Sequence, residues 1–121
     1  KHIVPYFHDF DQFIFHLEEL KDMDCDLILP SHGTLYTKED AIDTINYNLT
    51  RIKEVESAVV EAIKTPKTLS QVMQTLNLQV NDVVVFTLIE SSIKSILHSH
   101  INRGTAEAFV EKSNLYYLFK E

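Results

Sequence analysis

Apolar residues near the start of the chain recur every three or four positions, which is the spacing of one face of an α-helix. The members of this face are Phe10, Phe13, Ile14, Leu17 and Leu20. Asp9 stands just before them and Gln12 follows three residues later, a spacing typical of the capping box at a helix N-terminus. The pattern therefore predicts a helix from about Asp9 to Met23.

A short strand is predicted next, over residues 25–29, because this mostly apolar run ends at Pro30. The strand leads into a turn at residues 30–33, which contains His32. A single strand needs partners for its backbone groups, and the neighbouring sequence supplies no evident one. Because the chain also begins at Lys1 without an initiator methionine, we expect it to be a fragment or a processed product.

A long helix is predicted from Thr37, with Asp40 in its first turn, to about Lys64. Its apolar positions step by threes and fours and are Ile42, Ile45, Leu49, Ile52, Val55, Val59 and Ile63. Pro66 ends the helix, since the residue before a proline avoids the α conformation. We place a domain boundary there, between residues 1–65 and residues 66–121.

Two more helices are predicted in the second unit. Thr68 caps a short one over residues 69–76, and Asp82 begins a longer one that ends near Asn102. The predicted inner face of the short helix is Leu69, Val72, Met73 and Leu76. The predicted inner face of the longer helix is Val85, Phe86, Ile89, Ile93, Ile96, Leu97 and Ile101.

Gly104 follows the longer helix at the position of a left-handed C-cap. Two alternating strands, at residues 105–111 and 115–120, are joined by a short loop at residues 112–114, which predicts a β-hairpin. The order helix, turn, longer helix and two-stranded wing is that of a winged helix. The predicted fold class is thus mainly α with a little β.

The composition is that of an ordinary globular protein, with 45% hydrophobic and 24% charged residues. The net charge of −7 arises in residues 1–65, which carry thirteen acidic and six basic residues, whereas residues 66–121 carry five of each. This distribution argues against nucleic acid as a partner. No apolar run is long enough for a membrane span. The single cysteine, Cys25, suits a reducing interior and predicts a cytoplasmic location.

His32 lies in the sequence Leu29-Pro30-Ser31-His32-Gly33, at the exit of the predicted strand. Side chains at strand ends are where α/β folds build ligand sites, and imidazole is both a metal ligand and a general base. On this motif and on the order of its elements, the chain resembles the C-terminal part of a metallo-β-lactamase superfamily hydrolase, of the glyoxalase II-like and lactamase-B2-like branch. Ser31 replaces the glycine that is more frequent in that motif.

The resemblance implies the C-terminal end of an αββα sandwich followed by a small winged-helix-like unit. It also implies a site with two divalent metals, commonly zinc, in which metal-activated water attacks an ester, thioester, lactone or phosphodiester. Residue by residue, only His32 carries over as a metal ligand. The main ligand motif, His-x-His-x-Asp-His, is absent from this sequence. We therefore expect no catalytic residue in this chain, no stably bound metal, and a partner in the missing N-terminal part of the domain.

Three residues are weaker candidates for contact with substrate. Tyr47 and Arg51 lie four positions apart on the long helix and so share one face, where packing and salt bridges with Glu54 or Glu56 are the alternative explanation. His8 lies near the N-terminus, in a segment with Tyr6 that in such enzymes would border the active site.

The sequence gives less reason to assign a functional role to the other histidines. His98 and His100 are two positions apart on a helix, so they point to nearly opposite faces and are predicted to face solvent. His16 is placed on the polar side of the first helix. The exposed face of the longer winged-helix-like helix is predicted to be Glu90, Ser91, Lys94, Ser95 and His98, which is poorly suited to reading a DNA groove.

A non-enzymatic reading stays open, in which the chain is a winged-helix-like interaction or dimerisation module and its first half is a helical support. The unpaired strand and the long helix also favour association with a second copy. The sequence leaves open the substrate and the metal, because one histidine suits zinc, iron and manganese alike.

Overall fold

The computed structural model describes residues 6–23, 27–28 and 36–121 of the chain. Within this part the protein is mainly helical with a little β structure, as predicted, and its strands form two small antiparallel sheets. The elements are α1 (Phe10–Asp22), β1 (Leu27–Ile28), β2 (Tyr36–Thr37), α2 (Lys38–Ala62), α3 (Leu69–Thr75), α4 (Val83–Asn102), β3 (Ala106–Glu111) and β4 (Asn114–Phe119). None of the described helices is both long and apolar enough to cross a bilayer.

Each helix begins at the residue that the sequence predicts. The side chains of the N-cap residues accept a hydrogen bond from the backbone N–H three positions later, which satisfies one of the donors that the first turn leaves unpaired. The pairs are Asp9 with Gln12, Thr37 with Asp40, Thr68 with Gln71, and Asp82 with Val85. At Thr68 the Gln71 side chain also accepts from the N-cap N–H, which completes a capping box.

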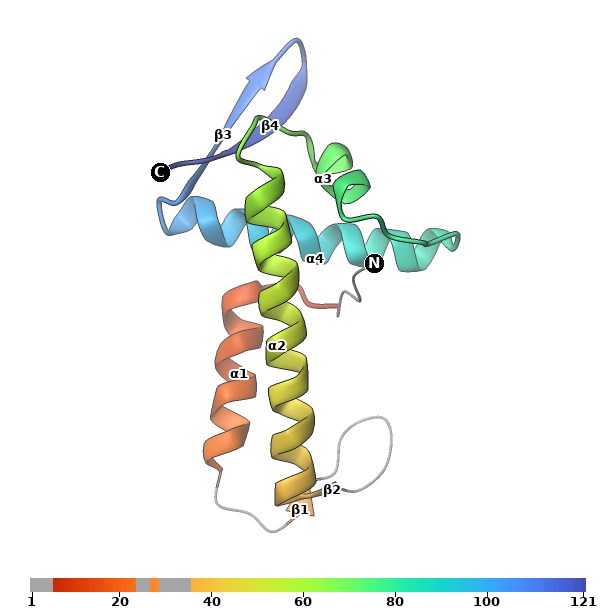
Figure 1. Cartoon of the computed structure of the whole chain (residues 1–121), viewed down its shortest axis with the longest axis vertical. Coiled ribbons are helices and arrows are strands. Elements are labelled where there is room, and N and C mark those ends of the chain that lie inside the picture. Colours follow the sequence, from red (N-terminus) through yellow and green to blue (C-terminus); the bar gives the residue numbers. More distant parts are fainter. Residues whose placement is uncertain (1–5, 24–26, 29–35) are drawn as a thin grey trace.

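Helices α1 and α2 lie side by side and run in opposite directions (Figure 1). The short strands β1 and β2 pair near the start of α2, with Leu27 opposite Thr37 and Ile28 opposite Tyr36. The expectation that the strand after α1 has no partner in this chain is therefore wrong. The partner was missed because β2 is only two residues long and its second residue, Thr37, is also the N-cap of α2.

The last part of the chain has the predicted order of helix, longer helix and two-stranded hairpin. Gly104 adopts a φ of +78°, the left-handed conformation expected at the end of α4. The β3–β4 hairpin closes through the two residues Lys112 and Ser113, which both have positive φ as a type I′ turn requires. The predicted three-residue loop is thus one residue shorter, because Asn114 already pairs with Glu111.

The hairpin is attached to the end of α2 through backbone hydrogen bonds on the outer edge of β4. Tyr117 and Lys67 exchange two of them, at 2.8 and 3.1 Å, and the Phe119 N–H donates to the Ile63 carbonyl at 2.8 Å. These bonds satisfy the edge of β4, which would otherwise be unpaired. The segment around Pro66, predicted as a domain boundary, is therefore held against the hairpin.

Two aromatic residues of β4 hold the hairpin against the helices. Tyr117 is 1% exposed, and Phe119 packs against the same buried cluster. On the other side of the strands, the rings of Phe109 and Tyr116 stack with their centroids 5.5 Å apart.

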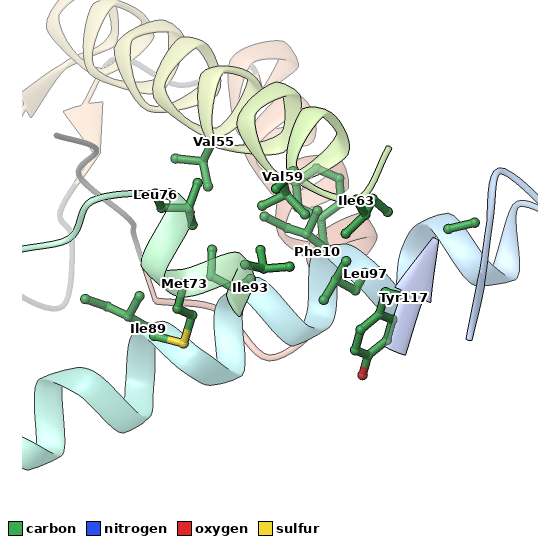
Figure 2. Packing of buried hydrophobic residues seen from close by; sticks show 14 of the residues in the cluster. Phe10, Val55, Val59, Ile63, Met73, Leu76, Ile89, Ile93, Leu97 and Tyr117 are labelled. Atoms are coloured by element: carbon green, nitrogen blue, oxygen red, sulfur yellow. The ribbon is translucent and has the colours of Figure 1, made fainter. Parts of the chain in front are cut away.

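Buried side chains from every helix meet in one cluster together with the hairpin (Figure 2). Its members are Phe7, Phe10, Ile52, Val55, Val59, Ala62, Ile63, Val72, Met73, Leu76, Ile89, Ile93, Ile96, Leu97, Ala106 and Tyr117. The cluster draws side chains from both sides of the predicted boundary, so the packing there is continuous.

The predicted inner face of α4 is correct from Ile89 onward but wrong at its start. Val85 and Phe86 are 44% and 43% exposed, whereas Ile93 is fully buried. The reason is length, since α4 has 20 residues and α3 has only 7. At 1.5 Å per residue, α3 is roughly 10 Å long and α4 roughly 30 Å long, so α3 cannot cover the whole of α4.

Burial raises the pKa of the Tyr117 hydroxyl above its usual value of 10.0. Below pH 10 the hydroxyl is protonated in both the folded and the unfolded state, so its full contribution to stability is present. As the pH rises from 10 toward the pKa of the folded state, the unfolded state loses the proton first and this contribution is lost. We expect the free energy of unfolding to fall more steeply above pH 10 in the wild type than in Tyr117→Phe, by up to about 1.4 kcal/mol per pH unit.

Urea unfolding of both proteins between pH 8 and pH 11 measures this difference. The pKa of Lys64 is also raised, by its hydrogen bond with Glu61, but this affects both proteins equally and cancels. Parallel curves for the two proteins would show that Tyr117 does not titrate on unfolding.

Candidate functional site

His32 lies outside the described residues, but the strands on either side of its segment are described. Ile28 and Tyr36 are opposite each other in the β1–β2 pair. The segment that carries His32 therefore leaves and re-enters the described structure at adjacent positions, beside the start of α2. These strands and the helix behind them are the described base of the candidate site.

Lys38 joins the end of α1 to the start of α2 at this base. Its Nζ donates hydrogen bonds to the carbonyls of Leu20, at 3.2 Å, and Met23. The last carbonyls of a helix have no partner within the helix and carry partial negative charge, so an ammonium group there is doubly favourable. Lys38 thus joins the C-terminal end of α1 to the N-terminal end of α2.

We expect Lys38→Met to lower the free energy of unfolding by about 1 kcal/mol, because methionine keeps most of the side-chain length but donates no hydrogen bond. Urea denaturation measures the change. Amide hydrogen exchange at Leu27 and Ile28 should also become faster. Lys53→Met, at an exposed lysine on the same helix, is the control. Equal midpoints for the two variants would contradict a role for Lys38 in holding this base.

Tyr47 and Arg51 lie on one face of α2, as predicted. The guanidinium carbon of Arg51 is 5.3 Å from the centroid of the Tyr47 ring, and Tyr47 is 57% exposed. Arg51 Nη2 also donates to Glu54 Oε1 at 3.1 Å. The alternative of a surface salt bridge is confirmed for Glu54, while Glu56 points to other partners.

His8 directly precedes the N-cap of α1, and the β1–β2 pair lies near the other end of that helix (Figure 1). Since α1 has 13 residues, about 20 Å separates the two places. The His8 ring contacts the Tyr6 hydroxyl, with Nε2 at 2.6 Å. His8 also borders a polar hollow of about 210 Å³, whose other lining residues are Asp9, Asp11, Ser95, His98, Ser99 and Asn102. His8 and the base of the His32 segment are therefore not brought together.

The described residues do not fit a two-metal site. In residues 6–23, 27–28 and 36–121, no three His, Cys, Asp or Glu side chains are grouped so that they could hold a metal ion. A bound divalent metal needs several such ligands at once. The described part of this chain therefore supplies no metal centre.

His100 is buried, so the prediction that it faces solvent is wrong. It is 8% exposed, and both ring nitrogens have partners. Nε2 lies 2.9 Å from Glu56 Oε2 on α2, and Nδ1 lies 2.7 Å from Thr105 Oγ1 at the start of the hairpin. With both nitrogens engaged, the imidazole joins three elements and is not free to act on a substrate. His98 and His16 are exposed, as predicted.

Polar contacts continue from His100 toward the start of α1. Arg103 Nη2 donates to Glu56 Oε2 at 3.1 Å, and its Nε and Nη2 donate to Ser99 Oγ at 3.1 and 2.7 Å. Ser99 Oγ in turn donates to the Asp11 carboxylate at 2.8 Å. The arrangement pairs a serine with an aspartate but brings no histidine to the serine, so it does not form a nucleophilic triad.

The position of His100 could have been read from the helical spacing. His100 lies seven residues after Ile93, four after Ile96 and three after Leu97, which places it on the same buried stripe. The prediction compared His100 only with His98 and so missed this signal.

A row of serines on α4 binds the segment that leads into α1. Ser92 Oγ accepts from the Phe7 N–H at 3.1 Å, and Ser95 Oγ accepts from the Phe10 N–H at 2.7 Å. The prediction that Ser95 is on an open face is therefore wrong, since that face of α4 is partly covered by this chain's own first helix.

No protein-family model and no curated protein sequence matches the chain. Its structure is similar to the crystal structure of a β-lactamase domain protein from Burkholderia ambifaria, with a TM-score of 0.69 over 89% of this chain and 16% sequence identity. The fold resembles part of a β-lactamase domain. Because the match covers 32% of that protein, this chain spans about a third of its length.

Proposed function

We propose that this chain is the C-terminal part of a metal-dependent hydrolase of the metallo-β-lactamase superfamily, which cleaves an ester, thioester, lactone or phosphodiester. The observation that carries the proposal is the structural similarity to the β-lactamase domain protein, which extends over 89% of this chain. It agrees with the independent resemblance of the Leu29–Gly33 motif to the last metal-binding element of that superfamily.

In this proposal the chain contributes His32 and the structure that supports it. The β1–β2 pair, which contacts α2, brings Ile28 and Tyr36 opposite each other, and Lys38 joins the start of α2 to the end of α1. Zinc or another divalent metal, in a two-metal site, would be bound mainly by the N-terminal part of the domain, because the described residues here do not form a metal centre. The chain alone would bind no metal stably and would be inactive.

Contact with substrate is proposed for Tyr47 and Arg51, which form an aromatic and cationic pair on α2 in which the Tyr47 ring is exposed and Arg51 is partly buried. His8 would have to act at a separate place, because α1 separates it from the β1–β2 pair. A cytoplasmic location is proposed on the single cysteine, and nucleic acid is not a proposed partner since residues 66–121 carry as many acidic as basic residues.

The test uses the full-length protein encoded by the reading frame that contains this chain. The upstream sequence should encode His-x-His-x-Asp-His, and the purified protein should contain two metal ions per chain by elemental analysis. His32→Ala should lower the metal content toward one ion and reduce hydrolysis of a model thioester and a model phosphodiester by about 100-fold or more.

His98→Ala is the matched control, because His98 is exposed on α4. It should leave both the metal content and the hydrolysis rate unchanged. A reading frame without the ligand motif, or a full-length protein without metal, would overturn the proposal.

The second candidate is a winged-helix-like interaction or dimerisation module. It is favoured by the order of α3, α4 and the hairpin and by the exposed apolar start of α4. Hydrolase activity in the full-length protein distinguishes the first candidate from a module that acts by binding alone.

A further inference from the structure

His100 lies where α2, α4 and the start of the hairpin meet. Its ring is almost fully buried, with Nε2 beside Glu56 Oε2 of α2 and Nδ1 beside Thr105 Oγ1. A neutral imidazole has one N–H donor and one acceptor nitrogen, whereas an imidazolium has two donors. The hydrogen bonds that its two partners can make therefore determine which form of the ring fits this position.

Glu56 requires a donor at Nε2. Its Oε2 atom accepts a hydrogen bond from Arg103 Nη2 at 3.1 Å, and a guanidinium group can only donate. The same oxygen lies 2.9 Å from Nε2 of His100. Because an ionised carboxylate has no proton to give, Nε2 carries the proton of this second bond.

Thr105 requires a donor at Nδ1. A hydroxyl has a single proton, and that of Thr105 points to the His100 carbonyl oxygen at 3.1 Å. The Thr105 N–H donates to the same carbonyl at 2.9 Å, so both lone pairs of this oxygen are used. With its proton committed, the hydroxyl can only accept from Nδ1, which lies 2.7 Å away.

The charged groups around His100 also favour a positive ring. Glu56 pairs with Arg103, and Arg103 lies 3.7 Å from Asp11 of α1, so two carboxylates share one guanidinium. Lys53 borders an adjacent hollow with these residues but is exposed, and solvent screens its charge. Among the described contacts of His100, the hairpin supplies a hydroxyl and no titratable group. An imidazolium therefore gives this cluster equal numbers of positive and negative charges.

We propose that the folded protein holds His100 as the imidazolium, so that the junction of α2, α4 and the hairpin weakens when the ring loses a proton. The junction then acts as a pH-sensitive device built into the fold. It does not depend on the hydrolase proposal, and either can fail without the other.

The pH dependence of unfolding tests the proposal. Below about pH 6.5 a histidine of an unfolded chain is itself protonated, so both states carry the proton and the stabilisation is complete. Above this pH the unfolded state loses the proton first. The unfolding equilibrium constant of the wild type should then rise relative to that of His100→Gln, by up to about tenfold per pH unit.

Urea unfolding of both proteins between about pH 5.5 and pH 8.5 measures this ratio. Glutamine keeps an amide donor but does not titrate, and the other histidines are common to both proteins. His98→Gln, at an exposed histidine two positions away, is the matched control and should follow the wild type. A ratio that does not change with pH would overturn the proposal. A ratio that falls as the pH rises would also overturn it, because the fold would then favour the neutral ring.

A second measurement needs no variant to fold. Long-range ¹H–¹⁵N correlation spectra of the wild type at about pH 7.5 report the protons on each histidine ring. Both ring nitrogens of His100 should have the similar shifts of an imidazolium, and His98 provides an exposed reference in the same spectrum. Widely separated shifts for His100, with one nitrogen unprotonated, would overturn the proposal.

Discussion

Replacing Ile93 with alanine is expected to lower the free energy of unfolding by about 3–4 kcal/mol. Ile93 is fully buried on α4 and belongs to the cluster that also contains side chains of α2 and α3 (Figure 2). The loss combines the transfer free energy of the removed methyl and methylene groups with the cost of the cavity that remains. Because small domains are stable by only about 5–15 kcal/mol, the change removes a large share of the total.

The same variant tests whether the two predicted domains unfold separately. The cluster joins residues of α2 with residues of α4 and the hairpin across the predicted boundary. We therefore expect Ile93→Ala to accelerate amide exchange in α2 and in β4 by a similar factor, and urea unfolding to stay a single transition. Val110→Ala, on the exposed face of the hairpin, should change the stability by less than about 0.5 kcal/mol.

Two separate transitions, with only the residues after Thr65 destabilised, would instead establish two independent domains. A loss below about 1 kcal/mol would mean that the site collapses around alanine, which the complete burial of Ile93 argues against.

The helix starts could be predicted from the sequence because capping is local. Asp9, Thr37, Thr68 and Asp82 each bond a backbone N–H only three residues away, so the signal and its effect lie in the same short window. The hairpin is local in the same sense, since its two strands are separated only by a two-residue turn. These local signals were enough to predict the order of most elements.

Exposure at the start of α4 could not be predicted in this way. The spacing of Val85 and Phe86 matches that of the buried residues that follow, so periodicity alone treats them alike. Whether they are covered depends on how far α3 reaches along α4, which is a property of the packed structure. The prediction therefore extended the buried face about one turn too far.

The contacts described around the candidate residues also differ in whether the sequence could predict them. The contact of Tyr47 with Arg51 follows from their spacing of four residues on one helix. The contacts of Glu56 with His100 and of Asp11 with Ser99 join residues 44 and 88 positions apart. No local pattern relates such residues, and only the packing of α1, α2 and α4 brings them together.

Replacing Glu56 with alanine is the second large effect that we expect, a loss of about 2–3 kcal/mol. The Glu56 carboxylate accepts hydrogen bonds from both His100 and Arg103, and its side chain is only 22% exposed. Removing it leaves the buried Nε2 of His100 without a partner, and an unsatisfied buried polar group costs more than the net value of the hydrogen bond itself. Chemical denaturation measures the loss.

Glu54→Ala is the matched control, since Glu54 lies two residues away on α2 and forms an exposed salt bridge with Arg51. Exposed pairs of this kind contribute little, so we expect a change below about 0.5 kcal/mol. A double-mutant cycle with His100→Ala should give a coupling energy of about 1–2 kcal/mol, because alanine at position 100 removes the group that Glu56 satisfies. Additive losses would mean that Glu56 stabilises the fold through Arg103 alone, and the imidazole would then not join α2 to the hairpin.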